Sequence, residues 1–137
     1  LVMVRASTAA KLGAKPLARI VSHATHAQEP EWFATAPVGA TQKALAKAGW
    51  TVKDVDLWEV NEAFAVVPMA LMHDFQVPHE IVNVNGGACA LGHPIGASGA
   101  RIMVTLMYAL QARGLKRGLA TLCIGGGEAT AVALEMM

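Results

Sequence analysis

The sequence predicts a layered α/β domain with a mixed sheet of about five strands and helices on both faces. Short apolar runs alternate along the chain with segments whose apolar residues recur at helical spacing, and this alternation is typical of α/β layers. Around Ile102, Leu106 and Leu110 the apolar face is wide enough for a helix in the middle of such a domain. The 137 residues contain no internal repeat and no long linker, so one domain is expected.

Two strands and one short helix are expected in the first part of the chain. The strands are the apolar runs Leu1–Val4 and Leu17–Val21, and the second ends at the polar stretch Ser22–Glu31. Between them Ser7 can cap a brief helix, for which Gly13 is the stop signal.

A longer helix, a strand and a second helix are expected next. After Pro37, apolar positions at helical spacing predict a helix that ends at Gly49. Val55–Val60 is the third predicted strand, and Asn61 is a plausible N-cap for a helix over residues 62–73. Pro68 inside that helix predicts a kink.

The last part of the chain is expected to hold a glycine-rich loop, the central helix and two strands. Ile81–Val84 is a short extended segment, and the loop follows it over residues 86–99. The helix Ala100–Arg113 is closed by Gly114. The strands Leu119–Ile124 and Ala129–Leu134 then flank three consecutive glycines.

The composition is unusually poor in charge. Only 15% of the residues are charged and 54% are hydrophobic, whereas about 25% are charged in typical soluble domains. This surplus of hydrophobic residues predicts that a second domain, a subunit or both cover part of the surface. The net charge is +1 with the basic residues scattered, so nothing indicates a partner nucleic acid or a membrane surface.

Other features of the sequence predict a cytoplasmic protein with reduced cysteines, of which this chain is one part. The two cysteines are too few for a disulfide scaffold. No apolar run reaches the ~18 residues of a membrane span, and no signal peptide is visible. The chain opens at Leu1 within a predicted strand, so it is expected to be cut from something longer.

Three polar or glycine-rich clusters each follow a predicted strand. They are Asn61-Glu62, residues 85–96 and residues 123–127. Ligand sites in open α/β sheets gather beyond the carboxyl ends of strands, although loops follow every strand. No phosphate-binding glycine motif is present, and no metal site is expected because Cys89 and His93 lack a second ligand pair.

His93 lies in the most distinctive of these segments, Gly92-His93-Pro94-Ile95-Gly96. A histidine titrates near neutral pH and can act as a general base or a hydrogen-bond donor. The flanking glycines would let a ligand or another chain segment approach closely. A loop histidine satisfied by a nearby carbonyl is the alternative.

Cys123, the glycines after it and Asn61 each allow two interpretations. The thiol could be activated by backbone N–H groups and a histidine, or Cys123 could be a small buried hydrophobic residue. The three glycines could supply an oxyanion hole or form only a tight hairpin turn. Asn61 could take part in the chemistry or only cap a helix.

Four motifs together resemble those of the thiolase family, in its C-terminal domain. They are NEAF at residues 61–64, NVNGGA at 83–88, GHPIGASGAR at 92–101 and CIGGG at 123–127. Their order and spacing agree along nearly the whole chain. The resemblance implies a layered thiolase-type domain over residues 1–137, with the N-terminal half of the enzyme absent from this chain.

The resemblance also implies residue roles. His93 would help activate a nucleophilic cysteine and contribute to an oxyanion hole, and Asn61 would hold a water that completes this hole. Cys123 would carry a proton to or from the attacking acyl carbon, and the Gly125 N–H would help form a second oxyanion hole. Ala63 and Phe64 match positions that line the pantetheine channel.

Three positions depart from the family pattern. Phe33 stands where a methionine is common, which would alter the acyl pocket. Cys89 stands where an aliphatic residue is usual and is not the family's nucleophile, which lies in the N-terminal half. Glu128 follows the glycines where other residues are frequent, and the sequence does not explain it.

The implied function is reversible Claisen condensation and thiolysis of acyl-CoA thioesters, which are substrates rather than cofactors. The expected partners are acyl-CoA or coenzyme A, the N-terminal half, and further copies in a homodimer or homotetramer. This chain alone would be inactive because it lacks the nucleophile. Two alternatives are a non-catalytic acyl-CoA-binding or assembly domain, and a condensing enzyme acting on carrier-protein thioesters. The latter typically has a second histidine at the position of Cys123.

Overall fold

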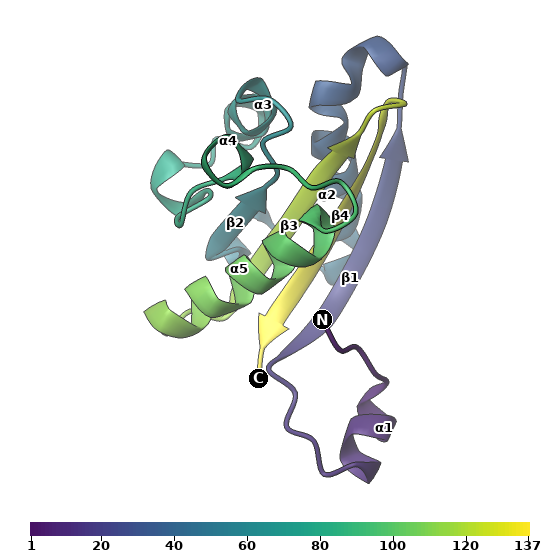
Figure 1. Cartoon of the computed structure of the whole chain (residues 1–137), viewed down its shortest axis with the longest axis vertical. Helices are drawn as coiled ribbons and strands as arrows, with labels where there is room; N and C mark the ends of the chain where they lie inside the picture. Colours follow the sequence, from purple (N-terminus) through teal and green to yellow (C-terminus); the bar gives the residue numbers. More distant parts are fainter.

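Four strands form one mixed sheet in the computed structural model, which describes residues 1–137 (Figure 1). The spatial order is β1 (Ala18–Ala27), β4 (Glu128–Met136), β3 (Arg117–Ile124) and β2 (Leu57–Val60). β4 runs antiparallel to both of its neighbours, and β2 pairs with β3 in parallel. The predicted layered α/β fold with a mixed sheet is therefore confirmed.

Helices cover both faces of this sheet. On one face, α2 (Ala36–Ala48) and α3 (Val66–Phe75) pack into the larger of two hydrophobic clusters. The sheet-facing alanines of α2, fully buried, let the helix lie close to β1 and β4. On the other face, α5 (Ser98–Arg113) packs into a smaller cluster with β2 and β3.

Several element predictions are confirmed. The short helix is α1 (Ala6–Lys11), and α2 and α5 end at the predicted glycines. Gly49 has φ 69° and Gly114 has φ 65°, the left-handed conformation that glycine adopts at helix C-termini. The last two strands also form as predicted, slightly longer at their ends.

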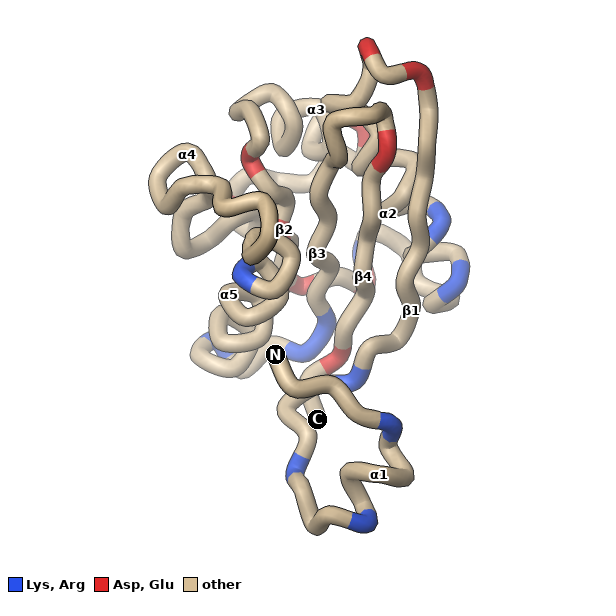
Figure 2. The backbone as a smooth tube through the Cα atoms, turned by 45° about the vertical axis from the view of Figure 1, so that its right-hand side comes forward, with Lys and Arg blue, Asp and Glu red and all other residues tan.

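The N-terminal strand predictions need two corrections. Leu1–Val4 is not a strand but an exposed segment that is not part of the four-stranded sheet, and Figure 2 shows the chain running from the N-terminus near the lower end of the sheet into α1. β1 does not stop at Val21 but continues to Ala27. It continues because Ser22 and Ala24 alternate inward with outward polar side chains, so one face of a polar-looking stretch is buried.

The Asn61 region also differs from its prediction. Asn61 does not cap a helix, because α3 begins only at Val66 and has no side-chain cap. Pro68 is therefore the third residue of α3, in the first turn, where a missing N–H costs no intrahelical bond and produces no kink. The extended segment around Val82 is reduced to one parallel bridge with Trp58.

Short helices complete the connections. The 3-10 turns are η1 (Pro30–Thr35), η2 (Val52–Asp54) and η3 (His79–Ile81), and the glycine-rich loop contains α4 (Ala88–Leu91). None of the helices has the length and hydropathy of a membrane span.

A charged cluster ties the lower end of the sheet together. Arg117 lies 3.2 Å from Asp54 and 3.2 Å from Glu135, and its guanidinium stacks over the Trp50 ring. Arg19 pairs with Glu135 at 2.6 Å. Arg19 and Arg117 lie at the starts of β1 and β3, and Glu135 lies near the end of the antiparallel β4, so the cluster is at the end of the sheet opposite to the carboxyl ends of β2 and β3.

Candidate functional site

The carboxyl ends of β2 and β3 bring together two of the three clusters that the sequence singles out. Because the two strands are parallel neighbours, Asn61 after β2 lies beside the end of β3, and the Asn61 N–H donates to the Thr121 carbonyl at 3.0 Å. The loop that carries His93 passes over this edge. Asn61 Nδ2 and His93 Nε2 are 3.3 Å apart.

Asn61 is completely buried, and its side chain is held from two sides. The amide nitrogen faces His93, and the amide oxygen accepts a long hydrogen bond of 3.5 Å from Arg101 Nη2. A buried amide needs such partners, since unpaired polar groups in the interior are costly. Asn61 thus has a fixed orientation at the strand end instead of the helix-capping role that its sequence context suggested.

His93 is anchored by the start of α5. Its Nδ1 lies 2.6 Å from the hydroxyl of Ser98, and that hydroxyl donates to the Pro94 carbonyl at 3.1 Å. Gly92, with φ 90°, allows the sharp turn that precedes the histidine. The histidine therefore does more than satisfy a loop carbonyl, because its two ring nitrogens both contact side chains of the site.

Glu62 and Asn83 hold the glycine-rich loop in place. Glu62 accepts hydrogen bonds from the Cys89 N–H at 2.9 Å and from Asn83 Nδ2 at 3.1 Å. The Asn83 side chain bonds both the N–H and the C=O of Val60, at 2.8 and 2.9 Å. A Cβ at Gly87 would clash with the Glu62 carboxyl group, so a larger residue there would displace Glu62 from its hydrogen bonds to Cys89 and Asn83.

Sequence reasoning missed a buried ion pair under the site. Glu59, 1% exposed, lies 3.2 Å from Arg101. Burial raises the pKa of Glu59 to about 7, although the attraction of Arg101 acts in the opposite direction. Its Oε1 has no hydrogen-bond partner. The available signal was an acidic residue inside the apolar strand Leu57-Trp58-Glu59-Val60.

The two cysteines have different surroundings. Cys123 is 6% exposed on β3, and burial raises the pKa of its thiol, so the sulfur carries its proton at neutral pH. It is not hydrogen-bonded to His93 or Asn61. Cys89 is exposed, and a hydrogen bond to Glu62 raises the pKa of its thiol.

The glycines after Cys123 form the turn between β3 and β4. Gly127 has φ 92°, and its carbonyl accepts the Gln28 N–H at 3.0 Å. The N–H groups of Gly125 and Gly126 have no partner among the backbone hydrogen bonds. The segment is therefore both a tight hairpin and a source of free backbone donors near the end of β3.

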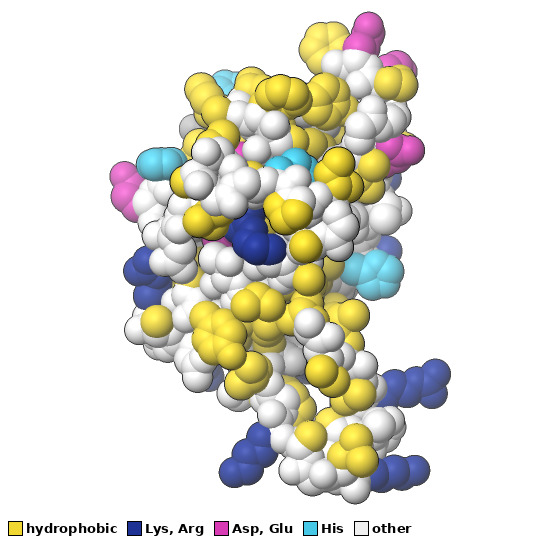
Figure 3. All heavy atoms as spheres, viewed as in Figure 1, with side chains coloured by type: hydrophobic (Ala, Val, Ile, Leu, Met, Phe, Trp, Pro, Cys, Tyr) yellow, Lys and Arg dark blue, Asp and Glu magenta, His cyan; other side chains and the backbone are white.

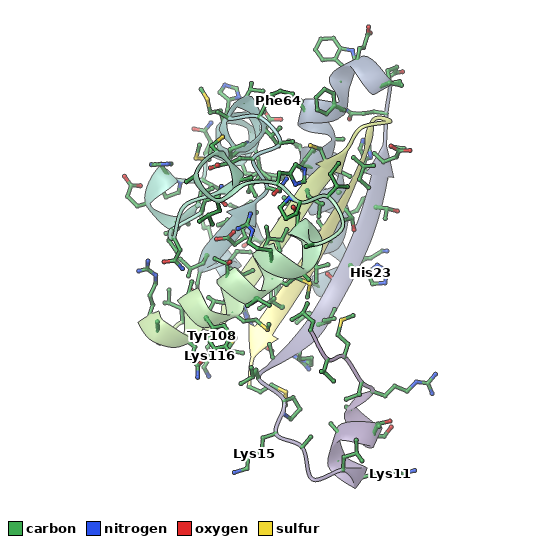
Figure 4. The ribbon with its side chains drawn as sticks, in the orientation of Figure 1. Lys11, Lys15, His23, Phe64, Tyr108 and Lys116 are labelled. Carbon is green, nitrogen blue, oxygen red and sulfur yellow. The ribbon has the colours of Figure 1, made fainter.

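Two aromatic rings from distant segments meet beside the site. Phe33 on η1 and Phe64 after β2 contact edge to face, with centroids 6.0 Å apart. Phe64 is 60% exposed and is labelled in Figure 4, and Ala63 packs partly buried against the larger core. Hydrophobic side chains gather on the upper part of this face (Figure 3). No group of three or more His, Cys, Asp or Glu side chains could hold a metal ion.

Comparison with known proteins gives consistent matches. A family model described as "Thiolase, C-terminal domain" matches residues 14–136. An acetyl-CoA acetyltransferase of Allochromatium vinosum is 53% identical over 99% of this chain and 34% of its own length. Another, of Chromobacterium violaceum, is 57% identical over 91% of this chain and 32% of its own length. The chain thus spans about a third of the length of these curated relatives.

Solved structures have the same fold. The acetyl-CoA acetyltransferase of Bacillus anthracis superposes with a TM-score of 0.93 at 42% identity, covering 96% of this chain and 34% of that one. The Acat5 thiolase of Ascaris suum, solved in complex with coenzyme A, superposes with a TM-score of 0.90 at 40% identity. The match covers 97% of this chain and 34% of the Ascaris suum chain.

Proposed function

The chain belongs to the thiolase family as a C-terminal domain, and from this premise we propose that it forms part of an acyltransferase acting on coenzyme A thioesters. The reaction is reversible Claisen condensation and thiolysis. The observation that carries the proposal is the contact of Asn61 with His93 at the strand ends, 3.3 Å between nitrogens, within motifs that match the family. The relatives named as acetyl-CoA acetyltransferases support the same class.

His93 and Asn61 serve the thioester oxygen in this proposal. The imidazole takes a proton from the nucleophilic cysteine elsewhere in the enzyme, and the Asn61 amide holds a water for the oxyanion hole. Forming an enolate from a thioester requires donors that are already oriented when charge develops. The two-sided anchoring of both side chains supplies that orientation.

Cys123 and Gly125 serve the second half of the reaction. A thiol that keeps its proton at neutral pH can donate it to a departing carbon or, after losing it, take one from acetyl-CoA. The free N–H of Gly125 is positioned after the same strand and stabilises the oxygen of the acyl-enzyme. Splitting the transfer through a covalent intermediate lowers each barrier.

Ala63, Phe64 and Phe33 bind substrate in this proposal. The exposed ring of Phe64 and the edge of Phe33 form an apolar wall suited to the pantetheine arm and the acyl group. The whole enzyme combines this chain, as the C-terminal domain over residues 1–137, with the remaining two thirds of a thiolase, and it assembles as a homodimer or homotetramer.

A pair of cysteine variants in the full-length enzyme tests the proposal. Cys123→Ser should lower condensation strongly, because a hydroxyl exchanges protons poorly near neutral pH. Acyl-enzyme formation, followed as a burst of released coenzyme A, should suffer less. Cys89→Ile is the matched control and should leave both steps nearly unchanged. Loss of activity in Cys89→Ile with full activity in Cys123→Ser would refute the assignment of proton transfer to Cys123. An intact wild-type protein without turnover would instead indicate a non-catalytic binding domain.

A further inference from the structure

A continuous chain of hydrogen bonds runs from the buried ion pair to the start of α5. Arg101 contacts both Glu59 Oε2, at 3.2 Å, and Asn61 Oδ1, at 3.5 Å. Asn61 Nδ2 contacts His93 Nε2, and His93 Nδ1 contacts Ser98, whose hydroxyl donates to Pro94. The guanidinium at one end can only donate, so the directions of the hydrogen bonds from Arg101 through Asn61 to His93 can be deduced.

The Arg101 end determines which way the Asn61 amide points. A guanidinium has donors only, so the group that faces it must be an acceptor. Asn61 therefore turns its oxygen to Arg101 and its NH₂ to His93. An NH₂ donor facing Nε2 requires that this ring nitrogen carry a lone pair.

The Ser98 end agrees with this tautomer but does not fix it by itself. The Ser98 hydroxyl donates to the Pro94 carbonyl, which also accepts the N–H groups of Ala97 and Ser98, and in this orientation the hydroxyl offers lone pairs to the N–H of His93 Nδ1, 2.6 Å away. Because the carbonyl keeps two backbone donors, the hydroxyl can also turn its hydrogen toward Nδ1. The Arg101 end therefore decides for neutral His93 with N–H at Nδ1 and a lone pair at Nε2.

We propose that Glu59 and Arg101 are positioning residues that fix the orientation of the Asn61 amide and, through it, the tautomer of His93. Glu59 holds the guanidinium in place: it is buried beside Arg101, whose side chain is 22% exposed, at the floor of the site. Neither residue needs to touch substrate. The catalytic consequence rests on the proposed function, in which His93 is the base toward the nucleophilic thiol, because Nε2 is then the ring nitrogen whose lone pair can take the proton.

The pair has a clear alternative role, which is structural support alone. Replacing a buried ion pair by apolar residues of similar volume is often neutral or stabilising. A Glu59→Leu, Arg101→Met double variant therefore keeps the fold and the net charge while it removes the donor to Asn61 Oδ1. If the pair is only structural, the tautomer of His93 will not respond to this change.

The first measurement reads the tautomer directly. The ¹⁵N spectrum of the 137-residue chain with labelled histidine separates ring nitrogens that carry hydrogen from those that carry a lone pair, and a His93→Gln spectrum assigns the signal. We expect the Nδ1–H tautomer in the wild type and a mixture of tautomers in the double variant. An Nε2–H tautomer in the wild type, or an unchanged tautomer in the folded double variant, overturns the proposal.

The second measurement uses the full-length enzyme. The double variant should lose roughly ten- to a hundredfold in kcat with little change in KM, because substrate contacts stay while the base is misoriented. The control Arg19→Met, Glu135→Leu removes the Arg19–Glu135 pair and the contact of Glu135 with Arg117 at the opposite end of the sheet, and it should change neither value nor the spectrum. Unchanged kcat in the folded double variant overturns the catalytic consequence.

A milder variant keeps the proposal testable if the double variant does not fold. Glu59→Gln preserves volume but no longer holds Arg101 by charge, so it should give a smaller change of tautomer in the same direction. A Glu59→Gln spectrum identical to the wild type would then overturn the proposal. A wild-type enzyme with the expected tautomer but no turnover would refute the proposed function and leave the positioning intact.

Discussion

At the scale of single residues, the environment of Glu59 has a consequence for stability. Its pKa rises from an ordinary 4.5 to about 7, with burial as the largest cause. A folded state that holds the proton more tightly than the unfolded chain gains stability at low pH. This contribution is fully present below pH 4.5 and is lost as the pH rises through 7.

Glu59→Gln should reveal this linkage. Relative to the variant, the wild-type free energy of unfolding should fall as the pH rises from about 4.5 to 8, by about 3 kcal/mol at most. The variant lacks the titrating group, so it supplies the reference. Urea unfolding of both proteins across this range measures the difference. A difference that is flat or grows with pH would contradict the raised pKa.

His93→Ala tests the central residue of the site. In the full-length enzyme we expect kcat to fall at least ~10²-fold, the scale for losing one oxyanion-hole donor. The fold should survive, because His93 lies on a loop and is only partly buried. Near-normal turnover in a folded variant, checked by circular dichroism and thermal unfolding, would mean that the histidine is structural.

Sequence reasoning identified the residues with distinctive chemistry but not those that support them. His93, Asn61 and Cys123 stand out by residue type and by their positions after strands. Glu59 and Arg101 do not, because a single acid in an apolar strand and a single base on a helix become a pair only when the fold places them 3.2 Å apart. The sequence spacing of 42 residues contains no local signal for that contact.

At the scale of elements, local signals succeeded where one residue type decides the geometry. Gly49 and Gly114 end their helices in the left-handed conformation, which no other residue adopts as easily. Local sequence signals failed where packing against another element decides the structure. β1 continues through Ser22 and Ala24 because these small side chains fit under α2, where the Ser22 hydroxyl donates to the Ala44 carbonyl at 2.7 Å.

The hairpin glycine provides a prediction at this scale. Gly127 has φ 92°, and a Cβ there would stand 2.3 Å from the Gln28 carbonyl oxygen. Gly127→Ala should therefore combine backbone strain with a clash and cost roughly 3 kcal/mol or more in the free energy of unfolding.

Gly114→Ala is the matched control for the hairpin variant. Gly114 has φ 65° but open space around its Cβ position, so only the strain of about 1–2 kcal/mol remains. Denaturant unfolding of the two variants measures the difference. Equal losses of stability would show that the turn relaxes away from Gln28.

At the scale of the whole molecule, the alternation of strands and helices was enough to predict the layers. The strand order β1-β4-β3-β2 was not predicted, because it depends on long-range pairing that periodicity does not report. The apolar surplus predicted a covered surface, and the structure shows exposed apolar side chains such as Val2, Ile95 and Phe64. Leu1–Val4 looked like a strand because it is apolar, but within this chain no other strand pairs with it.

The last prediction concerns the 137-residue chain by itself, which should show no acetyl transfer to coenzyme A. Its two thiols are unsuited to carry the acyl group: Cys123 is buried and keeps its proton, and the pKa of Cys89 is raised by Glu62. A reactive cysteine needs a lowered pKa instead. The assay compares the folded chain, verified by circular dichroism, with the full-length enzyme at equal molar concentration. Turnover above background that disappears in a Cys89→Ile or Cys123→Ser chain would show that this chain contains its own nucleophile, and the division of roles proposed above would then be wrong.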